Sequence, residues 1–522
     1  MTEGMQAYRA APRPLGELVA GWVAVPPELT VSDLTLDSRA AIPGTLFLAC
    51  RGRTHHGLRF APEAVALGAR AVLYEPDDAA PAPPRLPAEV FVAPVPALTE
   101  RAGLIADRFF GAPSERLTVA GITGTNGKTT CAWLLAQALQ RCGRQAGYIG
   151  TLGVGLPPQV TWMPHTTPDA VMVHRLLAAL AAAGAECVSM EVSSHALDQA
   201  RVNGVRFHAA AFTNLTRDHL DYHGTMEHYG AAKARLFAWP GLASRIINFD
   251  DPFGAALAGA AAARSNAPPT RTPAGTARLI LTTRRAGAAS ALPTDAQFVR
   301  ATRIQAEPTG LTIEVESSWG AALLPVRLMG EFNVDNALTV LAVLLAWDIP
   351  LRDAARALSK VRAARGRMEM FGGRGRSPLT IVDYAHTPDA LTNALRAARL
   401  HCRGQLRVVF GCGGDRDAGK RPLMGRIAAE LADDVMLTDD NPRSEDPQRI
   451  VADIVAGIGS AAPLTIEHDR ALAIRVALQR SAPDDVVLIA GKGHEDYQIA
   501  GGERRAFRDQ SVVADELARL PT

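Results

Sequence analysis

Residues 117–143 read LTVAGITGTNGKTTCAWLLAQALQRCG, and this stretch decides the fold around it. An apolar run predicts a strand, a glycine-rich turn follows, and the residues after the turn predict a helix. Successive glycines let backbone N–H groups surround phosphates, with Lys128 at the β and γ oxygens and Thr129 available to ligate Mg²⁺. The strict spacing GxxxxGK[ST] requires glycine at position 122, which is Ile122. The alternative is a glycine-rich turn that only caps a helix.

The regions beyond this stretch alternate short apolar runs with helical segments. Apolar runs that end in polar residues occur at 186–192, 210–215 and 244–251, which predicts an α/β domain with a largely parallel sheet. A stretch rich in Ala, Pro and Thr at 255–277 is expected to be a surface insertion without chemistry.

The C-terminal part repeats this alternation. Polar clusters directly follow four apolar runs: DYAHTPD (383–389), GCGGDRD (411–417), DDNPR (439–443) and GKGHED (491–496). The carboxyl ends of parallel strands share one edge of a doubly wound sheet, and ligands bind in the crevice there. We therefore expect the four clusters to converge on one site.

Length and composition indicate a soluble protein of several domains. A chain of 522 residues is too long for one core, and 48% hydrophobic with 21% charged residues is ordinary for globular domains. A net charge of +2 gives no electrostatic case for nucleic acid or a membrane surface. Six cysteines without CxxC indicate neither a disulfide framework nor a zinc site. No signal peptide or membrane-length apolar run is recognisable, which predicts a cytoplasmic protein.

Lysine is rare in this chain, because arginine supplies most of the positive charge. Lysine and arginine together number 55, yet the lysines are only Lys128, Lys233, Lys360, Lys420 and Lys492. A primary amine can have a lowered pKa and can react as a nucleophile, which a guanidinium cannot do. Lys233, in the sequence AAKARLF, is therefore either a reactive amine or an ordinary salt-bridging helix residue.

Six other polar positions have ordinary explanations when each is taken alone. They are Glu191, His219, Asn333, Asn336, Arg367 and Asp383. A carboxylate at a strand end is usually solvated or caps a helix, and N-capping would explain one of the asparagines, which precede an apolar helix. The surroundings of His219 match no zinc spacing. No single motif decides the function.

Ten motifs, taken together and in order, resemble the Mur ligases of bacterial cell-wall synthesis. They are GTNGKT, EVSSH, DHLDYHG, AAK, GEFNVDNAL, GRME, DYAHTPDAL, GCGGDRD, DNPR and GKGHE. The family departs from the strict P-loop spacing, which accounts for Ile122. The resemblance implies an α/β fold of three domains. These are an N-terminal α/β uridine-nucleotide-binding domain (1–97), a central P-loop ATPase-like domain with a mostly parallel sheet (98–364), and a C-terminal Rossmann-like domain that binds the incoming amino acid (365–522).

The resemblance implies ATP, Mg²⁺ and CO₂ as cofactors, the last because Lys233 matches a lysine that is carbamylated in the family. The implied ATP contacts are Gly124, Thr125, Asn126, Gly127, Lys128, Thr129, Thr130, Asn333, Asn336, Arg367 and Asp383. The implied Mg²⁺ ligands are Thr129, Glu191, His219 and the carbamate of Lys233. Lys128, Glu191, His219 and Lys233 would thus serve catalysis.

The implied substrates are UDP-N-acetylmuramoyl-L-alanyl-D-glutamate and meso-diaminopimelate. Family positions for the first are Leu36, Ser38, Thr166, Thr167, Ser193, Gln199 and Arg201. Contacts at 53–55, where this chain departs from many relatives, stay open. Family positions for meso-diaminopimelate are Arg416, Asp440, Asn441, Pro442, Arg443, Gly491 and Glu495. A guanidinium suits the far carboxylate of diaminopimelate, and acidic groups suit its ammonium. Arg508, in FRDQ where FDD is more usual, changes an acidic position.

The expected reaction is ATP-dependent amide formation through an acyl phosphate of D-glutamate, in peptidoglycan precursor synthesis. A monomer without nucleic-acid partners is expected. Alternatives are a lysine-adding ligase of the same family, folylpolyglutamate synthetase, a catalytically silent nucleotide-binding relative, and a P-loop motor or switch ATPase. The LDSR and DNPR motifs argue against the first two.

Overall fold

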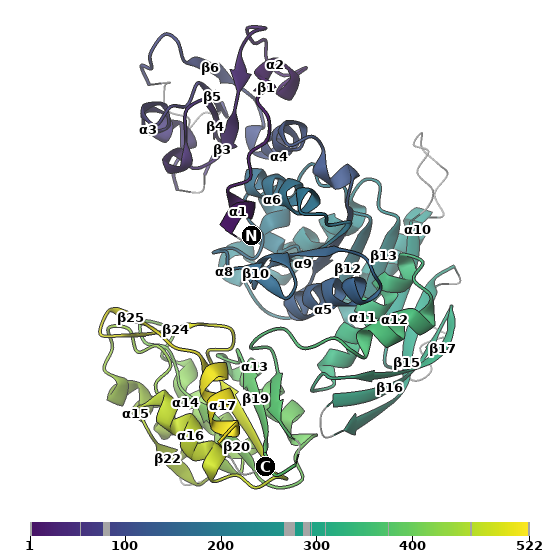
Figure 1. Ribbon diagram of the computed structural model, residues 1–522, viewed down its shortest axis with the longest axis vertical. Coiled ribbons are helices and arrows are strands. Elements are labelled where there is room, and N and C mark those ends of the chain that lie inside the picture. Colours follow the sequence, from purple (N-terminus) through teal and green to yellow (C-terminus); the bar gives the residue numbers. More distant parts are fainter. Residues whose placement is uncertain are drawn as a thin grey trace. The chain divides into compact units, whose positions relative to one another are not determined.

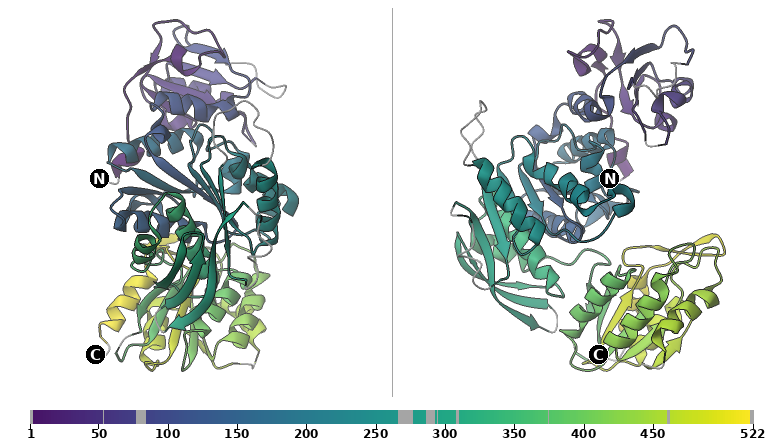
Figure 2. Two further views of the ribbon diagram at one scale, coloured as in Figure 1. Left: turned by 90° about the vertical axis from the view of Figure 1, so that its right-hand side faces the viewer. Right: turned by 180° about the vertical axis from the view of Figure 1, so that it is seen from behind.

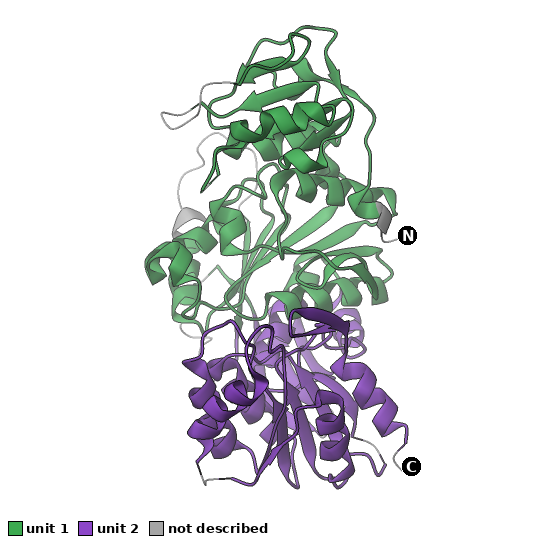
Figure 3. Ribbon diagram, turned by 90° about the vertical axis from the view of Figure 1, so that its left-hand side faces the viewer, with its two compact units in different colours: residues 1–282, 289–298, 342–349 green, residues 283–288, 299–341, 350–522 purple. Residues whose placement is uncertain are grey.

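The computed structural model describes residues 3–52, 54–76, 84–265, 277–285, 293, 295–307, 310–373, 375–459 and 462–519 (Figure 1). The chain forms two compact units, coloured separately in Figure 3, and each is described by itself. Unit 1 comprises residues 1–282, 289–298 and 342–349, and unit 2 comprises the remainder. None of the helices within the described ranges is both long and apolar enough to cross a membrane.

Unit 1 begins with a small sheet of four parallel strands in the order β3-β4-β5-β6. The strands are β3 (Asp33–Thr35), β4 (Thr45–Ala49), β5 (Ala71–Tyr74) and β6 (Phe91–Pro94). Alternate residues of β4 enter different cores, since Leu46 and Leu48 pack with α4 (Leu98–Phe109), whereas Phe47 and Ala49 pack with α3 (Ala61–Ala66). Both faces of this sheet are therefore buried.

The larger sheet of unit 1 has the strand order β10-β9-β8-β11-β7-β12-β13-β14. The six strands from β8 to β14 are parallel, as the sequence predicts, and β9 and β10 add an antiparallel edge. These strands are β7 (Thr118–Thr123), β8 (Ala146–Gly150), β9 (Gly153–Leu156), β10 (Gln159–Thr161), β11 (Cys187–Glu191), β12 (Ala209–Phe212), β13 (Ser244–Asn248) and β14 (Arg278–Thr283). The central position of β7 places the carboxyl ends of β11 and β12 on either side of the glycine-rich loop.

Helices cover this sheet and connect its strands. They are α5 (Lys128–Arg141), α6 (Ala170–Ala182), α7 (Ser194–Asp198), α8 (Leu220–His223), α9 (Met226–Ala234) and α10 (Pro252–Ser265). Leucines of α6 share a core with the alternate strand residues Val119, Val188 and Met190. The expected surface insertion at 255–277 is helical in α10 up to Ser265, and residues 266–276 lie outside the described ranges.

Unit 2 contains an antiparallel meander and a Rossmann-like sheet. The meander is β15 (Gln297–Glu307), β16 (Gly310–Ser317) and β17 (Gly320–Val326), followed by α11 (Phe332–Ala346), which extends into unit 1, and α12 (Leu351–Leu358). The second sheet has the order β18-β19-β23-β20-β21-β22, all parallel except β18. Its strands are β18 (Glu369–Gly372), β19 (Leu379–Asp383), β20 (Leu406–Phe410), β21 (Asp434–Leu437), β22 (Leu464–Ile466) and β23 (Val486–Ala490), and a hairpin of β24 (Tyr497–Ala500) and β25 (Glu503–Ala506) lies beyond it.

Helices cover both faces of the Rossmann-like sheet (Figure 2). They are α13 (Pro388–Arg399), α14 (Lys420–Leu431), α15 (Pro447–Ile458), α16 (Arg470–Gln479) and α17 (Asp509–Leu517). Val408 and Leu488 pack with α13, α14 and α15, while Val409 and Ile489 pack with α16 and α17. The near-continuous apolar strands of the sequence are thus explained by burial on both faces, and the α/β prediction is confirmed.

Candidate functional site

The loop between β7 and α5 has the backbone that the sequence predicts for phosphate binding. Gly124 and Gly127 have φ of 151° and 86°, and a Cβ on Gly124 would lie 1.9 Å from Oγ1 of Thr213. The amine of Lys128 bends back and donates to the carbonyls of Gly124 (2.9 Å) and Thr125 (2.8 Å). The positive end of α5 therefore faces the loop together with this cation.

Two residues at the end of β12 hold this loop, and the sequence analysis did not assign them. The main chain of Asn214 accepts from the N–H of Thr125 (2.8 Å), and its side-chain oxygen accepts from the N–H of Asn126 (2.9 Å). Thr213 donates to the carbonyl of Asn126 (2.5 Å). The signal was present, because a polar Thr-Asn pair directly follows the apolar run at 209–212. Thr130 lies in the first turn of α5.

Glu191 ends β11 and is fully buried beside the start of α5. Its carboxylate accepts from the hydroxyls of Thr129 (2.8 Å) and Tyr148 (2.6 Å) and from the main chain of Thr151 (2.8 Å). Sequence reasoning missed Tyr148 and Thr151, which hold the carboxylate toward Thr129. The predicted pair of Thr129 and Glu191 is therefore brought together.

This pair fits Mg²⁺ in its donor chemistry, since both groups offer hard oxygen ligands. No cluster of three or more His, Cys, Asp or Glu side chains that could hold a metal occurs in the part of the chain that the structure describes. Mg²⁺ commonly takes one or two protein oxygens and completes its shell with phosphate and water. The arrangement therefore suits an ion that arrives with a polyphosphate.

Lys233 lies on α9 and is 1% exposed. Its amine donates to the carbonyl of Gly124 (2.8 Å), the same oxygen that Lys128 uses, and lies 4.2 Å from the ring centre of Tyr229. Burial, and then the charge of Lys128, holds the pKa of Lys233 well below its usual value, against the opposing charge of Asp218. A lower pKa raises the share of the neutral amine, which is the nucleophilic form that addition to CO₂ requires.

His219 precedes α8 in a left-handed conformation, with φ of 53°, and its side chain is half exposed. Its ring meets the ring of His195 edge-on at 4.8 Å between centres. Burial, followed by the nearby charges of His219 and His223, lowers the pKa of His195 to about 4. His195 is therefore a neutral side chain that packs against His219. The sequence analysis gave His195 no role.

Four of the positions expected at the uridine-nucleotide substrate form one hydrogen-bonded group next to Glu191. The hydroxyl of Thr167 donates to the carbonyl of Glu191 (2.7 Å) and accepts from the N–H of Ser193 (3.2 Å). Arg201 donates to the carbonyl of Thr167 (2.9 Å) and to the side-chain oxygen of Gln199 (2.6 and 2.9 Å). Thr166 joins through a hydroxyl pair with Thr151 (3.0 Å).

Leu36 and Ser38 follow β3 in the small sheet, and within the described residues no side-chain hydrogen bond joins them to that group. Ser38 donates to Glu63 (2.5 Å). The strand before them is anchored by the buried Arg175 of α6, which donates to the carboxylate of Asp33 (2.6 Å). Of the open positions 53–55, residue 53 lies outside the described ranges.

Asn333 and Asn336 lie inside α11 rather than before it, so N-capping, the ordinary alternative to a nucleotide role, explains neither of them. Asn336 donates to the side chain of Asn333 (2.8 Å), which donates to the carbonyl of Met329 (2.7 Å). Arg367 lies over the ring of Tyr384 at 4.7 Å, next to Asp383 at the end of β19. Burial raises the pKa of Asp383, opposed by the charge of Arg367.

Of the four clusters predicted to converge at the strand ends of unit 2, GKGHED and GCGGDRD are hydrogen-bonded to Asn441 of DDNPR, and the ring centre of Tyr384 of DYAHTPD lies 5.0 Å from that of His494. The side chain of Asn441 donates to Glu495 (2.8 Å) and accepts from the amine of Lys492 (3.1 Å), which also donates to Glu495 (3.0 Å). Lys492 is fully buried, and the sequence analysis gave it no role. Asp440 and the neighbouring Pro442 are buried too, and burial raises the pKa of Asp440 against the charges of Arg470 and Lys492.

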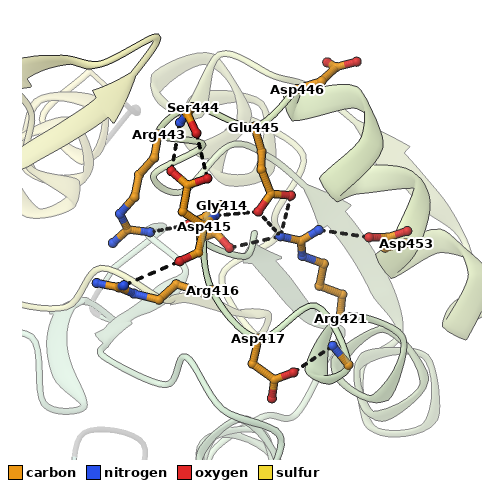
Figure 4. Close-up of polar contacts among 12 residues, drawn as sticks. Gly414, Asp415, Arg416, Asp417, Arg421, Arg443, Ser444, Glu445, Asp446 and Asp453 are labelled. Atoms are coloured by element: carbon orange, nitrogen blue, oxygen red, sulfur yellow. Dashed lines mark hydrogen bonds and ion pairs between the residues drawn. The ribbon is translucent and has the colours of Figure 1, made fainter.

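The two arginines expected at the acceptor lie on neighbouring loops (Figure 4). Arg443 is half-buried and donates to the carbonyl of Gly414 (2.7 Å), and Arg416 is exposed with a long contact to the carbonyl of Asp415 (3.5 Å). Gly491 follows β23 directly. Together with Asn441 and Glu495, these residues offer guanidinium, amide and carboxylate groups at one edge of the sheet.

Arg508, which stands where an acidic residue is more usual, lies near Asp496. It is half exposed and lies 3.6 Å from Asp496. Its neighbour Asp509 is fully buried and forms a bidentate pair with the buried Arg470 (2.8 Å for both contacts), which also donates to the carbonyl of Ala490. The acidic residue that supports the end of β23 is therefore Asp509.

Comparison with known proteins identifies related chains along nearly the whole length. The model of the Mur ligase middle domain matches residues 122–344, that of the Mur ligase glutamate ligase domain matches 366–493, and that of the Mur ligase family catalytic domain matches 30–110.

Two relatives share the name UDP-N-acetylmuramoyl-L-alanyl-D-glutamate–2,6-diaminopimelate ligase. The one from Xanthomonas campestris pv. campestris is 48% identical over 497 residues, which cover 95% of each chain. The one from Alkalilimnicola ehrlichii is 48% identical over 492 residues, which cover 93% of this chain and 95% of that one. A solved structure titled with the same enzyme name is 34% identical, has a TM-score of 0.72, and aligns over 98% of this chain and 100% of its own.

Proposed function

This chain belongs to the Mur ligase family, and we propose from that premise that it is an ATP-dependent ligase of peptidoglycan precursor synthesis. It adds meso-2,6-diaminopimelate to the D-glutamate of UDP-N-acetylmuramoyl-L-alanyl-D-glutamate. The observation that carries the proposal is the 48% identity, across 95% of both chains, to a ligase named for these substrates. We further propose domain boundaries near residues 97 and 364, a cytoplasmic location and a monomeric state.

The P-loop and the Mg²⁺ ligands would serve the polyphosphate end of the reaction. Backbone N–H groups at the start of α5 and the amine of Lys128 neutralise charge on ATP. The residues proposed to hold Mg²⁺ are Thr129, Glu191, His219 and carbamylated Lys233. When bound, Mg²⁺ supplies further charge neutralisation at the reacting phosphate. We assign Asn333, Asn336, Arg367 and Asp383 to the nucleotide.

Carbamylation of Lys233 would convert a buried amine into an anion. The neutral amine attacks the carbon of CO₂, a C–N bond forms, and one proton leaves the nitrogen. The lowered pKa of Lys233 and its hydrogen bond to the loop carbonyl of Gly124 support this assignment. The carbamate anion would also attract the Lys128 cation, which donates to the same carbonyl oxygen as the Lys233 amine.

Amide formation then proceeds in two substitutions. The γ-carboxylate of D-glutamate attacks the γ-phosphate of ATP, which releases ADP and leaves an acyl phosphate. The amine of diaminopimelate attacks the acyl carbon, and phosphate leaves from the tetrahedral intermediate. Because little covalent chemistry falls to the protein, positioning and charge neutralisation supply most of the acceleration.

Two sets of residues would position the organic substrates. The group of Thr166, Thr167, Ser193, Gln199 and Arg201, with Leu36 and Ser38, is assigned to the uridine-nucleotide substrate. The edge of the Rossmann-like sheet is assigned to diaminopimelate, through Arg416, Asp440, Asn441, Pro442, Arg443, Gly491 and Glu495. Guanidinium groups there suit the far carboxylate, which lysine lacks, and Glu495 and Asp440 suit an ammonium.

Acceptor-dependent phosphate release tests the proposal. The purified chain is given ATP, Mg²⁺ and the uridine-nucleotide substrate, with meso-diaminopimelate, L-lysine or no acceptor in parallel reactions. We expect release that requires diaminopimelate and is at background level without an acceptor. Release with lysine alone would replace the proposal by the lysine-adding activity, and absence of acceptor-dependent release would leave a catalytically silent relative.

A further inference from the structure

Two loops that carry the acceptor residues of unit 2 have an unusual backbone. Asp415, in the loop after β20, and Arg443, in the loop after β21, have φ of 53° and 57°. L-residues other than glycine rarely adopt this left-handed conformation, because Cβ approaches the carbonyl oxygen. Such residues persist only where their surroundings hold them in place, and they are concentrated at functional sites.

Direct hydrogen bonds join the two loops, as Figure 4 shows. Arg443 donates to the carbonyl of Gly414 (2.7 Å), and Ser444 donates to the carboxylate of Asp415 through its hydroxyl (2.7 Å) and its N–H (3.1 Å). The loops approach so closely that a Cβ on Gly414 would lie 1.9 Å from the carbonyl oxygen of Pro442. The conformation of one loop therefore depends on the other.

A buried arginine on α14 connects both loops to the helix layer. Arg421 is 1% exposed, and its guanidinium donates to both carboxylate oxygens of Glu445 (3.0 and 2.9 Å). Glu445 in turn accepts from the N–H of Asp415 (2.5 Å). Arg421 also reaches the carbonyl of Gly413 at 3.4 Å. The Arg421–Glu445 pair thus holds Asp415 directly, and it holds Arg443 through the hydrogen bonds between the two loops.

Asp453 offers a control within the same network. It lies on α15 and accepts from the opposite side of the Arg421 guanidinium (2.9 Å). Glu445 touches the acceptor loops, whereas the hydrogen bond of Asp453 is to Arg421 alone among the described residues. Both carboxylates neutralise one buried cation, but of the two only Glu445 is hydrogen-bonded to the loops.

We propose that Arg421 and Glu445 are positioning residues that aim Arg443 at the far carboxylate of the diamino-acid acceptor. Gly414 is the hydrogen-bond partner of the Arg443 guanidinium within the described residues, which leaves its other donors free for a carboxylate. A guanidinium fork is needed at position 421, because it must meet two carboxylates and a carbonyl at once. The inference rests on the proposed function, since it concerns the same acceptor.

Steady-state kinetics of Glu445→Gln, Arg421→Lys and Asp453→Asn test the inference. For the first two variants we expect KM for meso-diaminopimelate to rise about tenfold, as the loss of a charge-assisted hydrogen bond predicts. The KM values for ATP and for the uridine-nucleotide substrate should change less than twofold, and Asp453→Asn should resemble the unmutated chain. Hydrogen exchange of peptides covering 411–417 and 440–446 should accelerate in the same two variants only.

Four outcomes would overturn the inference. Equal effects of Glu445→Gln and Asp453→Asn would mean that Glu445 only neutralises the buried Arg421 cation and does not position Arg443. A general loss of kcat with unchanged KM for diaminopimelate would indicate a structural role. If the unmutated chain lacked diaminopimelate-dependent turnover, the proposed function would fail as well, whereas normal turnover with unaffected variants would contradict the positioning role alone.

Discussion

The nucleotide loop of unit 1 and the acceptor loops of unit 2 both use left-handed backbone, but they achieve it with different residues. The nucleotide loop has Gly124 and Gly127 at its positive φ angles, whereas the acceptor loops have Asp415 and Arg443. A loop that binds phosphate through its main chain gains from having no side chains there. A loop that recognises a carboxylate needs a side chain, and the strain must be offset by contacts elsewhere.

The largest expected effect concerns Lys233, the residue on which the nucleotide region depends most. Lys233→Ala should lower kcat about thousandfold, as expected when a main electrostatic stabiliser of the reacting charge is removed. Added short carboxylates should restore part of the activity by replacing the carbamate. Phosphate release measures this, with Lys360→Ala as the control, because Lys360 is exposed at the end of α12. Full activity of Lys233→Ala would contradict the carbamate assignment.

The next effect isolates the space that Gly124 requires. Gly124→Ala places a methyl group 1.9 Å from Oγ1 of Thr213, and it should lower kcat/KM for ATP about hundredfold through misplacement of the loop. Gly143→Ala is the matched control, since its φ is also positive, at 82°, but nothing lies within 4 Å of the added Cβ. It should lose only about 1 kcal/mol of unfolding free energy. Similar KM values for ATP in both variants would show that strain, rather than space, matters at Gly124.

The two regions differ in how far the sequence predicted them. The nucleotide loop was predictable because its information is local: strand, glycines, Lys128 and Thr129 are consecutive, and Glu191 ends a neighbouring apolar run. The sheets were predictable from their apolar runs, since both faces are buried. The supports of the acceptor loops were not, because Arg421, Glu445 and Asp415 act through contacts between loops and a helix. Neither periodicity nor composition predicts that Arg421, at the polar start of α14, is buried.

A third test separates strain from recognition at Arg443. Both Arg443→Ala and Arg443→Gly should raise KM for diaminopimelate about thirtyfold, because each leaves the acceptor carboxylate without its guanidinium. Gly tolerates φ of 57° and Ala does not, so Arg443→Gly should unfold with about 1 kcal/mol more free energy than Arg443→Ala. Urea unfolding measures the difference. Equal stabilities would mean that the loop relaxes once the side chain is gone.

The smallest expected effect is a pH dependence, and it has opposite signs in the two regions. Burial lowers the pKa of Lys233, so its contribution to stability is lost as pH falls through the folded pKa. Burial raises the pKa of Asp440, so its contribution is present below the pKa of an unfolded aspartate and is lost as pH rises through the folded pKa. The same desolvation therefore favours the neutral form of both groups.

Binding of the acceptor should require ionised Asp440, although burial favours the neutral form of this residue. Because the ammonium of diaminopimelate needs an ionised partner, its KM should fall several-fold as pH rises through the raised pKa of Asp440. Asp440→Asn should flatten this profile. Asp439→Asn is the control, since Asp439 also has a pKa raised by burial but accepts from His468 (2.8 Å) outside the acceptor set. If the pH dependence of KM were lost in Asp439→Asn and kept in Asp440→Asn, the titrating group would be Asp439. The ammonium site would then be assigned to Asp439 as well.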